Sequence, residues 1–277
     1  YPKETYKGVN YQMLPSDIVG DDDGGQTATW AASHGQTLSS NKDTGEGWPG
    51  CRDIDHKSDN VRNNYNAYLK FLLEDLGYTG FRYDMVKGFA PEYVAQYNQA
   101  AQPQFSVGEY WDNSTATKLW VNGTKVNNVP QSAAFDFPFR YTVRDAANSG
   151  DWSKLENGSN APLINSRQFR QYAVTFVENH DTQMRSASEP LDPIKKDTLA
   201  ANAYLLAMPG TPCVFYRHWL DHKQAIKAMI EVRRAAGVVN TSVPTIVSRE
   251  PKQYVVSVAG TKGTLLCVLG DEAENYA

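Results

Sequence analysis

Cysteine is scarce in this sequence of 277 residues. The three cysteines, Cys51, Cys213 and Cys267, lie far apart and in no spacing that is typical of a metal site. An odd number of widely separated cysteines excludes a disulfide scaffold and a zinc site held by cysteine. Cys213 and Cys267 lie inside apolar runs, so we expect both thiols to be buried.

Long apolar runs and a large net charge are also lacking. No stretch is long and apolar enough to span a bilayer, and the formal net charge is −4 with a pI of about 5.8. We therefore expect neither a nucleic-acid partner nor a membrane partner. No signal peptide is visible, and the chain begins with Tyr1 rather than Met, which is consistent with a natural N-terminus further upstream.

Strand and helix patterns alternate through the middle of the chain, which is typical of parallel βα units. The helix with the clearest stripe of apolar residues begins after Ser58, a residue type that caps helices. After residue 238 the pattern changes to period-two alternation, which predicts antiparallel strands. The predicted helices are 59–76, 91–101, 118–121, 195–208 and 222–236, the predicted parallel strands are 80–88, 104–107, 132–139, 172–177 and 212–216, and the predicted antiparallel strands are 245–247, 253–259 and 264–269.

These changes of pattern predict three regions. Residues 1–57 have no helical periodicity and read as loop and irregular strand, residues 58–238 hold the βα units, and residues 239–277 begin an antiparallel β-domain. The stretch 140–170 reads as loop with short helices. In helix 222–236 we expect Ile226, Met229, Ile230 and Val232 to face inward.

The strand at Gly80–Gly88 carries an unusual charge pair. Arg82 and Asp84 would lie on one face, with Phe81, Tyr83 and Met85 on the other. A cation and a carboxylate on a buried strand are costly unless they pair. We interpret Asp84 as the reacting group of an enzyme and Arg82 as its electrostatic partner, with a buried structural ion pair as the alternative.

Three carboxylates, at Asp84, Glu109 and Asp181, each follow a predicted parallel strand. In a (β/α)8 barrel the carboxyl ends of the strands form the rim where active sites are built. Two carboxylates that face one glycosidic bond can hydrolyse it, one as nucleophile and the other as acid and then base. This chemistry requires a raised pKa at the acid, which we expect to be Glu109.

Several segments resemble the α-amylase family of retaining glycoside hydrolases (family 13), most closely the plant-type and related bacterial members. The resemblance rests on Gly80–Asp84, Val107–Trp111, Phe176–Asp181, Asp53–His56 and Gly210–Tyr216, which occur in the family's order and cover nearly the whole chain. It implies that Asp84 is the nucleophile, Glu109 the general acid/base and Asp181 the stabiliser of the transition state.

The resemblance also implies binding residues. Arg82 would position the nucleophile, His180 would bind the substrate, and Lys87 and Trp111 would hold the leaving-group side of the glucan. Asp53 and the carbonyl oxygen of Gly88 would bind a structural Ca²⁺. The acidic run 21–23 has two interpretations, a calcium loop and a solvated turn, and its lack of EF-hand spacing favours the turn. His56, His218 and His222 are interpreted as structural or solvated residues.

The resemblance predicts an α/β fold of the (β/α)8 TIM-barrel type, here incomplete. Counting strands, the chain would start within a remnant of domain B and supply barrel strands four to eight, then the start of the C-terminal β-domain. We therefore expect a fragment that is truncated at both ends, and weak activity or none for the isolated chain, because open sheet edges and a split core would remain.

The expected function is endo-hydrolysis of α-1,4-glucosidic bonds. The expected partner is an α-glucan polysaccharide or a maltooligosaccharide, and the expected location is secreted or extracellular. A related transglycosylase, an oligo-α-glucosidase and an inactive glucan-binding fragment are the alternatives. Product analysis on amylose separates the first two from an endo-hydrolase, and binding without turnover identifies the third. The sequence leaves the oligomeric state open.

Overall fold

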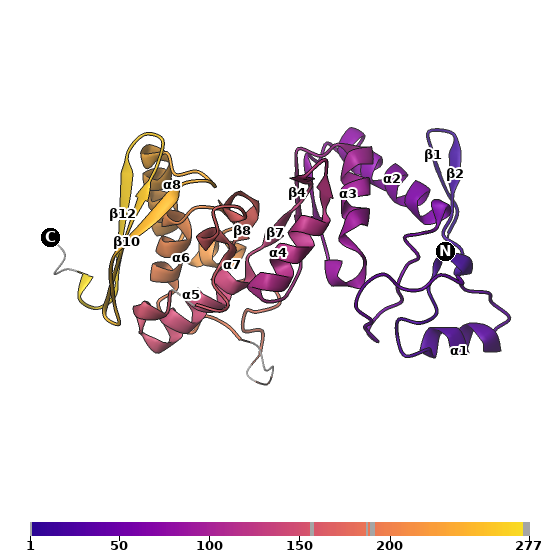
Figure 1. Cartoon of the computed structure of the whole chain (residues 1–277), viewed down its shortest axis with the longest axis horizontal. Helices are drawn as coiled ribbons and strands as arrows, with labels where there is room; N and C mark the ends of the chain where they lie inside the picture. Colours follow the sequence, from indigo (N-terminus) through magenta and orange to yellow (C-terminus); the bar gives the residue numbers. More distant parts are fainter. Residues whose placement is uncertain (1, 156–157, 187, 189–191, 274–277) are drawn as a thin grey trace. The chain divides into compact units, whose positions relative to one another are not determined.

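A computed structural model describes residues 2–155, 158–186, 188 and 192–273 (Figure 1). The chain divides into two compact units. The first unit comprises Tyr1–Tyr110 and Leu119–Ser132, and the second comprises Trp111–Lys118 and Ala133–Ala277. The two domain boundaries predicted from the sequence, after residues 57 and 238, stay predictions.

The first unit opens with a hairpin and a helix that the sequence patterns did not predict. Helix α1 (Gln26–Ser33) follows two glycines in left-handed conformation, and the carboxylate of Asp23 accepts hydrogen bonds from Thr27 N at 3.0 Å and Thr27 Oγ1 at 2.6 Å. The prediction of loop and irregular strand over 1–57 was wrong for this short helix, which is fixed by its capping residues, whereas the two short strands of the hairpin fit it. The elements before it are β1 (Glu4–Tyr6), β2 (Val9–Tyr11) and η1 (Pro15–Asp17).

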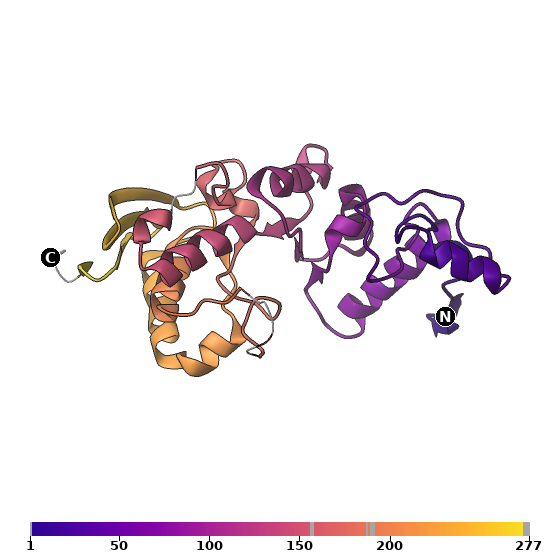
Figure 2. The same ribbon diagram turned by 90° about the horizontal axis from the view of Figure 1, so that it is seen from below.

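The centre of the first unit matches the predicted alternation. Helix α2 (Asp59–Glu74) is capped by Ser58, whose hydroxyl accepts a hydrogen bond from Val61 N. It packs against α3 (Pro91–Ala101), as both ribbon views show (Figures 1 and 2). The core between them and the sheet is formed by Leu69, Phe81, Tyr93 and Tyr97.

Strands β3 (Gly80–Tyr83) and β4 (Phe105–Gly108) pair in parallel, with Tyr83 opposite Gly108. The residues that follow the two strands therefore leave the same edge of the pair. The predicted strand 80–88 ends early, at Tyr83, and Val86–Gly88 forms the short helix η2. Met85 has a φ of 46° and lies outside the strand, so the expectation that it shares a face with Phe81 was wrong.

In the second unit, strand β7 (Ala133–Phe135) leads directly into helix α5 (Phe137–Ser149). The predicted strand 132–139 is confirmed only over Ala133–Phe135, and the prediction of loop with short helices over 140–170 was wrong for the part that α5 occupies. Asp136 is fully buried and caps the helix by accepting a hydrogen bond from Phe139 N at 3.1 Å. The residues of the predicted strand 132–139 are mostly apolar, and their periodicity does not distinguish a buried helix from a strand.

The next elements of the second unit are β8 (Ala173–Thr175), α6 (Thr198–Ala207), β9 (Thr211–Pro212), α7 (Tyr216–Asp221) and α8 (Lys223–Ala236). Strands β7, β8 and β9 pair in parallel. The predicted strand 212–216 was wrong beyond Pro212, where β9 ends, and Tyr216 begins α7. Val232 was expected to face inward but is 56% exposed.

Arg233 takes the buried position on α8. Its guanidinium donates hydrogen bonds to the backbone oxygens of Leu206 at 2.8 Å, Met208 at 2.6 Å and Gly210 at 3.1 Å. These bonds connect α8 to the end of α6 and the turn before β9. The apolar pattern could not reveal them, because charged residues are usually exposed.

The chain ends in an antiparallel sheet of β10 (Val243–Glu250), β11 (Gln253–Ala259) and β12 (Thr264–Leu269), as predicted. Helices α6 and α8 pack against this sheet (Figure 1). Cys267 is buried in β12, as predicted, whereas Cys213 is exposed, because the apolar run around it forms only a two-residue strand.

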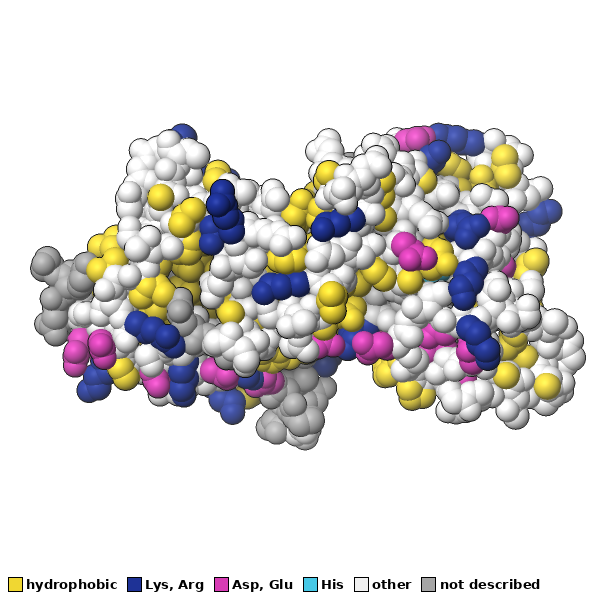
Figure 3. Space-filling model, in the orientation of Figure 1, with side chains coloured by type: hydrophobic (Ala, Val, Ile, Leu, Met, Phe, Trp, Pro, Cys, Tyr) yellow, Lys and Arg dark blue, Asp and Glu magenta, His cyan; other side chains and the backbone are white. Residues whose placement is uncertain are grey.

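The remaining elements are α4 (Ser114–Gly123), β5 (Lys125–Val126), β6 (Val129–Pro130), η3 (Trp152–Leu155), η4 (Leu163–Asn165) and η5 (Arg170–Tyr172). Among the described residues, no helix combines the length and the apolar character that a membrane crossing needs. On the face shown in Figure 3, the described basic and acidic side chains are interspersed.

Candidate active site

The first unit brings three of the predicted site residues together. Asp84 follows β3 directly, and Glu109 follows β4. The guanidinium of Arg82 bridges them, with Nη1 2.8 Å from Asp84 Oδ1 and Nη2 2.9 Å from Glu109 Oε1. The parallel pairing of β3 and β4 thus places two carboxylates on one cation.

The two carboxylates have different surroundings. The side chain of Glu109 is 8% exposed, and that of Asp84 is 64% exposed. Burial, assisted by a hydrogen bond with the side chain of Asp84, raises the pKa of Glu109, although the charge of Arg82 opposes the shift. Glu109 is therefore suited to hold a proton, and the negative charge of Asp84 is stabilised by the adjacent guanidinium.

The backbone between the strands also shapes this pair. Met85 has a left-handed conformation that costs energy for a residue with a side chain. In that conformation its N–H donates a hydrogen bond to Glu109 Oε2 at 3.3 Å. Glu109 N donates to the backbone oxygen of Tyr83 at 2.9 Å. Backbone strain of this kind concentrates at functional sites.

Lys87 and Gly88 lie in η2, just beyond Asp84. The Nζ of Lys87 is 3.0 Å from Glu46 Oε2 and 5.7 Å from the ring centroid of Tyr110. Gly45 is in close contact with this turn, since a Cβ added to it would lie 2.2 Å from the carbonyl carbon of Gly88. The predicted contact of Lys87 with substrate stays a prediction.

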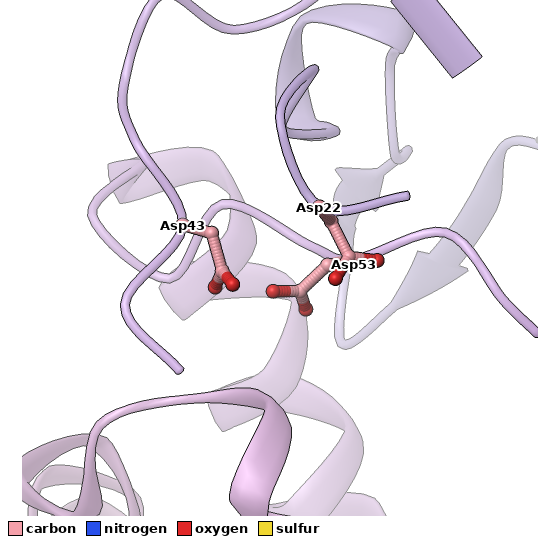
Figure 4. A group of neighbouring side chains, drawn as sticks. All are labelled: Asp22, Asp43 and Asp53. Carbon is pink, nitrogen blue, oxygen red and sulfur yellow. The ribbon is translucent and has the colours of Figure 1, made fainter. Parts of the chain in front are cut away.

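A cluster of three carboxylates occurs elsewhere in the first unit. Oxygen atoms of Asp22, Asp43 and Asp53 lie within 4.8 Å of one another and converge on one point (Figure 4). Burial, with hydrogen bonding to Asp43, raises the pKa of Asp53 to about 8. Bringing these carboxylates together without a cation is therefore costly. Oxygen ligands of this kind suit a hard divalent cation.

The second unit holds the third predicted carboxylate. In the segment after β8, His180 is exposed and Asp181 is partly exposed, with His180 Nε2 3.1 Å from Asp181 Oδ2. Asn179 Oδ1 accepts hydrogen bonds from Asp181 N at 3.0 Å and Thr182 N at 2.9 Å, which fixes a tight turn. The turn directs both side chains toward solvent.

Trp111 also belongs to the second unit. Its ring stacks on Phe137, with centroids 4.7 Å apart and planes 19° apart. Its indole nitrogen donates a hydrogen bond to Tyr141 Oη at 2.6 Å. Helix α5 therefore holds the ring in a fixed orientation while part of it stays exposed, which is the arrangement that a sugar-binding platform needs.

The first unit contains more than one cavity, and one of them lies beside Asp84. One of about 510 Å³ is lined by Arg82 and Asp84 together with aromatic side chains that include Tyr65, Phe81 and Phe89. A more apolar cavity of about 630 Å³ lies between the hairpin β1–β2 and helix α2, and none of the predicted site residues lines it.

No family model matches the chain. It is 31% identical over 252 residues to probable α-amylase 2 of Arabidopsis thaliana, an alignment that covers 83% of this chain and 58% of the relative. The chain belongs to the α-amylase family. Another relative of this α-amylase-family chain is the glucan 1,4-α-maltotetraohydrolase of Stutzerimonas stutzeri, with 31% identity over 220 residues, 74% of this chain and 39% of the relative.

Solved structures support the fold. The cyclic α-maltosyl-(1→6)-maltose hydrolase of Arthrobacter globiformis matches with a TM-score of 0.64 at 15% identity, covering 92% of this chain and 65% of its own. An Anoxybacillus α-amylase matches with a TM-score of 0.59 at 16% identity, covering 78% of this chain and 53% of its own. The α/β fold with parallel strands and a C-terminal antiparallel sheet is thus that of α-amylase-family enzymes.

The sequence patterns did not predict part of the carboxylate cluster in this α-amylase-family chain. The acidic run 21–23 was predicted to be a solvated turn, whereas the structure brings Asp22 against Asp43 and Asp53. Contacts between positions 22, 43 and 53 are non-local, so no spacing rule reveals them. The available signal was the density of aspartates in a segment with little regular structure.

The three histidines that were interpreted as structural or solvated residues differ in their contacts. His56 is buried, and its Nδ1 lies 2.7 Å from Tyr97 Oη. His218 is buried, with Nδ1 3.2 Å from Asn202 Nδ2. Burial lowers the pKa of each to about 4. Both therefore serve as neutral packing residues, and His222 is partly buried at the start of α8.

Proposed function

We propose that the chain carries the catalytic residues of a retaining α-glucan hydrolase that cleaves internal α-1,4-glucosidic bonds. The observation that carries this proposal is the bridge from Arg82 to Asp84 and Glu109, in which one carboxylate is exposed and the other buried. Two carboxylates with different environments on one cation are the equipment of glycoside hydrolysis. Membership of the α-amylase family supports the choice of substrate.

In the first step, Asp84 attacks the anomeric carbon while Glu109 gives its proton to the leaving glycosidic oxygen. The C–O bond of the glucan breaks as the bond to Asp84 forms. In the second step, Glu109 takes a proton from water, which attacks the same carbon and releases Asp84. Two inversions return the α-anomer. The raised pKa of Glu109 supports its role as the acid in the first step.

Four further residues are proposed to bind the sugar. Asp181 would stabilise the positive charge that develops on the ring, and His180 would donate a hydrogen bond to a hydroxyl group. Their exposure in a rigid turn supports these roles. Trp111 would stack on the leaving-group side of the glucan. Lys87 would release its ion pair with Glu46 and donate a hydrogen bond to the same part of the glucan.

A structural Ca²⁺ fits the cluster of Asp22, Asp43 and Asp53, because all three offer carboxylate oxygens. The carbonyl oxygen of Gly88 remains a proposed ligand. Gly88 lies in the turn that Gly45 contacts, and Gly45 is two residues after Asp43 in the chain. Bound calcium would supply no reaction chemistry. It would connect segments that have little regular structure of their own to the turn beyond Asp84.

The proposal extends to architecture, substrate and location. The parallel strands would be barrel strands four to eight, and the chain spans 58% of the length of the Arabidopsis relative. The substrate would be starch-like glucan or maltooligosaccharide, and one structural neighbour was solved with maltose. We propose secretion, although relatives named as chloroplastic and cytoplasmic α-amylases exist.

The experiment is hydrolysis of soluble starch by the purified chain, with Glu109→Gln as the control. We expect slow formation of new reducing ends, a gradual fall in viscosity and α-anomeric product in the first NMR spectra, because the activity expected of the isolated chain is weak. The Glu109→Gln variant should lose nearly all of this activity. A β-anomeric product, or starch binding without turnover, would contradict the proposal.

A further inference from the structure

A buried ion pair lies beneath the turn that carries His180 and Asp181. Arg140, on helix α5, is the largest of the fully buried side chains among the described residues. Its Nη2 is 3.4 Å from Oε1 of Glu178, which is also buried. Neither residue belongs to the proposed chemistry, yet Glu178 is only three positions before Asp181.

The pair connects two segments to the same helix. Glu178 Oε1 accepts a hydrogen bond from the hydroxyl of Thr182, and Glu178 Oε2 accepts one from Ile194 N at 2.8 Å. The other terminal nitrogen of Arg140 is 3.0 Å from Asp192 Oδ2. Arg140 and Glu178 together thus hold residues 178–182 and 192–194 against α5.

The connection reaches Asp181 through few bonds. The hydroxyl of Thr182 donates to Glu178 and also accepts a hydrogen bond from Asn179 N at 3.1 Å. The side chain of Asn179 in turn accepts the N–H of Asp181 at 3.0 Å. A displacement of Glu178 would therefore move the turn that presents His180 and Asp181.

Stability alone does not account for such a pair. Replacing a buried ion pair by packed apolar residues is often neutral or stabilising, because both charges must be removed from water. Hydrogen-bonded buried polar groups do, however, favour one arrangement of the backbone. Of the five polar side-chain atoms of Arg140 and Glu178, four have partners, and Arg140 Nε has none among the described residues. A fixed arrangement is valuable where a small displacement of a reacting group reduces the rate.

We propose that Arg140 is a positioning residue, which acts through Glu178 to fix the turn that presents Asp181 to the reacting sugar. This inference rests on the proposed function and adds a residue to it. Arg140 touches neither substrate nor reacting atoms. Its contribution is to hold a carboxylate that acts in the transition state, so its loss should appear in kcat more than in KM.

The test compares Arg140→Met, Arg140→Lys and a matched control, Arg233→Met, on a maltooligosaccharide. Arg233 is also a buried arginine of the second unit, but it binds backbone carbonyls far along the chain from the turn. We expect Arg140→Met to lower kcat by about 100-fold with little change in KM. Arg140→Lys, which keeps the charge, should recover part of the loss. Arg233→Met should lower Tm and leave kcat unchanged well below that Tm.

A second measurement is independent of turnover. In Arg140→Met, the amides of Asp181, Thr182 and Ile194 should exchange with deuterium at least about tenfold faster than in the wild type, whereas Arg233→Met should leave them unchanged. If Arg140→Met does not fold, Glu178→Gln replaces it, because the amide keeps the shape and loses the charge.

The outcomes separate the two proposals. A wild type that does not hydrolyse α-glucans overturns the proposed function, and the exchange measurement then still tests whether Arg140 holds the turn. If the wild type is active and Arg140→Met has wild-type kcat with only a lower Tm, this inference is overturned and the proposed function stands. Unchanged exchange at the three amides also overturns the inference.

Discussion

Arg82 forms ion pairs with two carboxylates whose chemistry differs because their surroundings differ. Glu109 lies under the backbone of Met85 and is shielded from water, whereas Asp84 faces solvent. At Glu109, Arg82 favours the ionised form and burial opposes it more strongly, whereas the side chain of Asp84 is largely exposed. One cation can therefore accompany a proton donor and an anionic nucleophile at the same edge of a sheet.

This balance predicts a pH effect for Arg82→Met. The general acid must be protonated, so kcat/KM falls as the pH rises through the pKa of Glu109. Removing the cation disfavours the carboxylate and raises that pKa further. We expect the basic limb of the pH–rate profile to move up by at least about one pH unit, at a much lower rate. Lys227→Met, on the exposed side of α8, should leave the limb in place. A limb that stays fixed or moves down in Arg82→Met contradicts this role for Glu109.

At this scale the sequence predicted residue types and their order but not their surroundings. The positions of Asp84 and Glu109 after successive strands indicated that they would leave one sheet edge, and the register of β3 and β4 confirms that the two strands end side by side. The burial of Glu109 and the left-handed turn at Met85 depend on packing from other segments, which no local pattern contains.

Helix α5 is the element that most changes the interpretation. Phe137 and Tyr141 in its first turns contact Trp111. Arg140 in the same part of the helix contacts Glu178, beneath the turn that carries His180 and Asp181. The sequence patterns predicted a strand followed by loop in this region. Phe135, Phe137 and Phe139 alternate as in a strand, and the local signals for a helix are the cap at Asp136 and a proline in the first turn.

The cap at Asp136 predicts a stability change. Its carboxylate accepts hydrogen bonds from Phe139 N at 3.1 Å and Ile164 N at 3.3 Å, so Asp136→Ala leaves two buried donors unpaired. We expect a loss of about 1–3 kcal/mol in the free energy of unfolding. Ser58→Ala, which removes the cap of the more exposed helix α2, should cost less. Equal or smaller losses at Asp136 would contradict this account of α5.

The loss should also depend on pH. Burial raises the pKa of Asp136 from 3.8 to about 6, so the folded state binds this proton more tightly than the unfolded state. The corresponding stabilisation is complete below pH 4 and is lost as the pH rises through about 6. Thermal unfolding of wild type and Asp136→Ala should therefore differ more at pH 4.5 than at pH 7.

At the scale of the whole molecule, order along the chain was more predictable than contact between distant segments. The family motifs occur in sequence order and indicated the family, which the relatives confirm. The C-terminal sheet was predicted because its strands are adjacent in the chain. The sequence did not predict that Asp22, Asp43 and Asp53 lie close together, because each comes from a different irregular segment.

That cluster predicts a calcium effect on the stability of the protein. After treatment with a chelator, adding Ca²⁺ should raise Tm, by an amount that corresponds to about 2.7 kcal/mol at a concentration 100 times the dissociation constant. Asp53→Asn should abolish most of this rise, and Asp145→Asn, an exposed acidic residue of α5, should keep it. A full calcium effect in Asp53→Asn would contradict the proposed metal site.

The central claim is that Asp84 becomes covalently bound to the sugar during turnover. The direct measurement uses the Glu109→Gln variant with an α-glucosyl fluoride, whose leaving group needs no acid, followed by mass spectrometry of the peptide that contains residues 80–88. The account predicts a mass increase of one glucosyl residue on Asp84, absent in the same variant carrying Asp84→Asn. An adduct on another residue, or starch hydrolysis at the wild-type rate by Asp84→Asn alone, would contradict it.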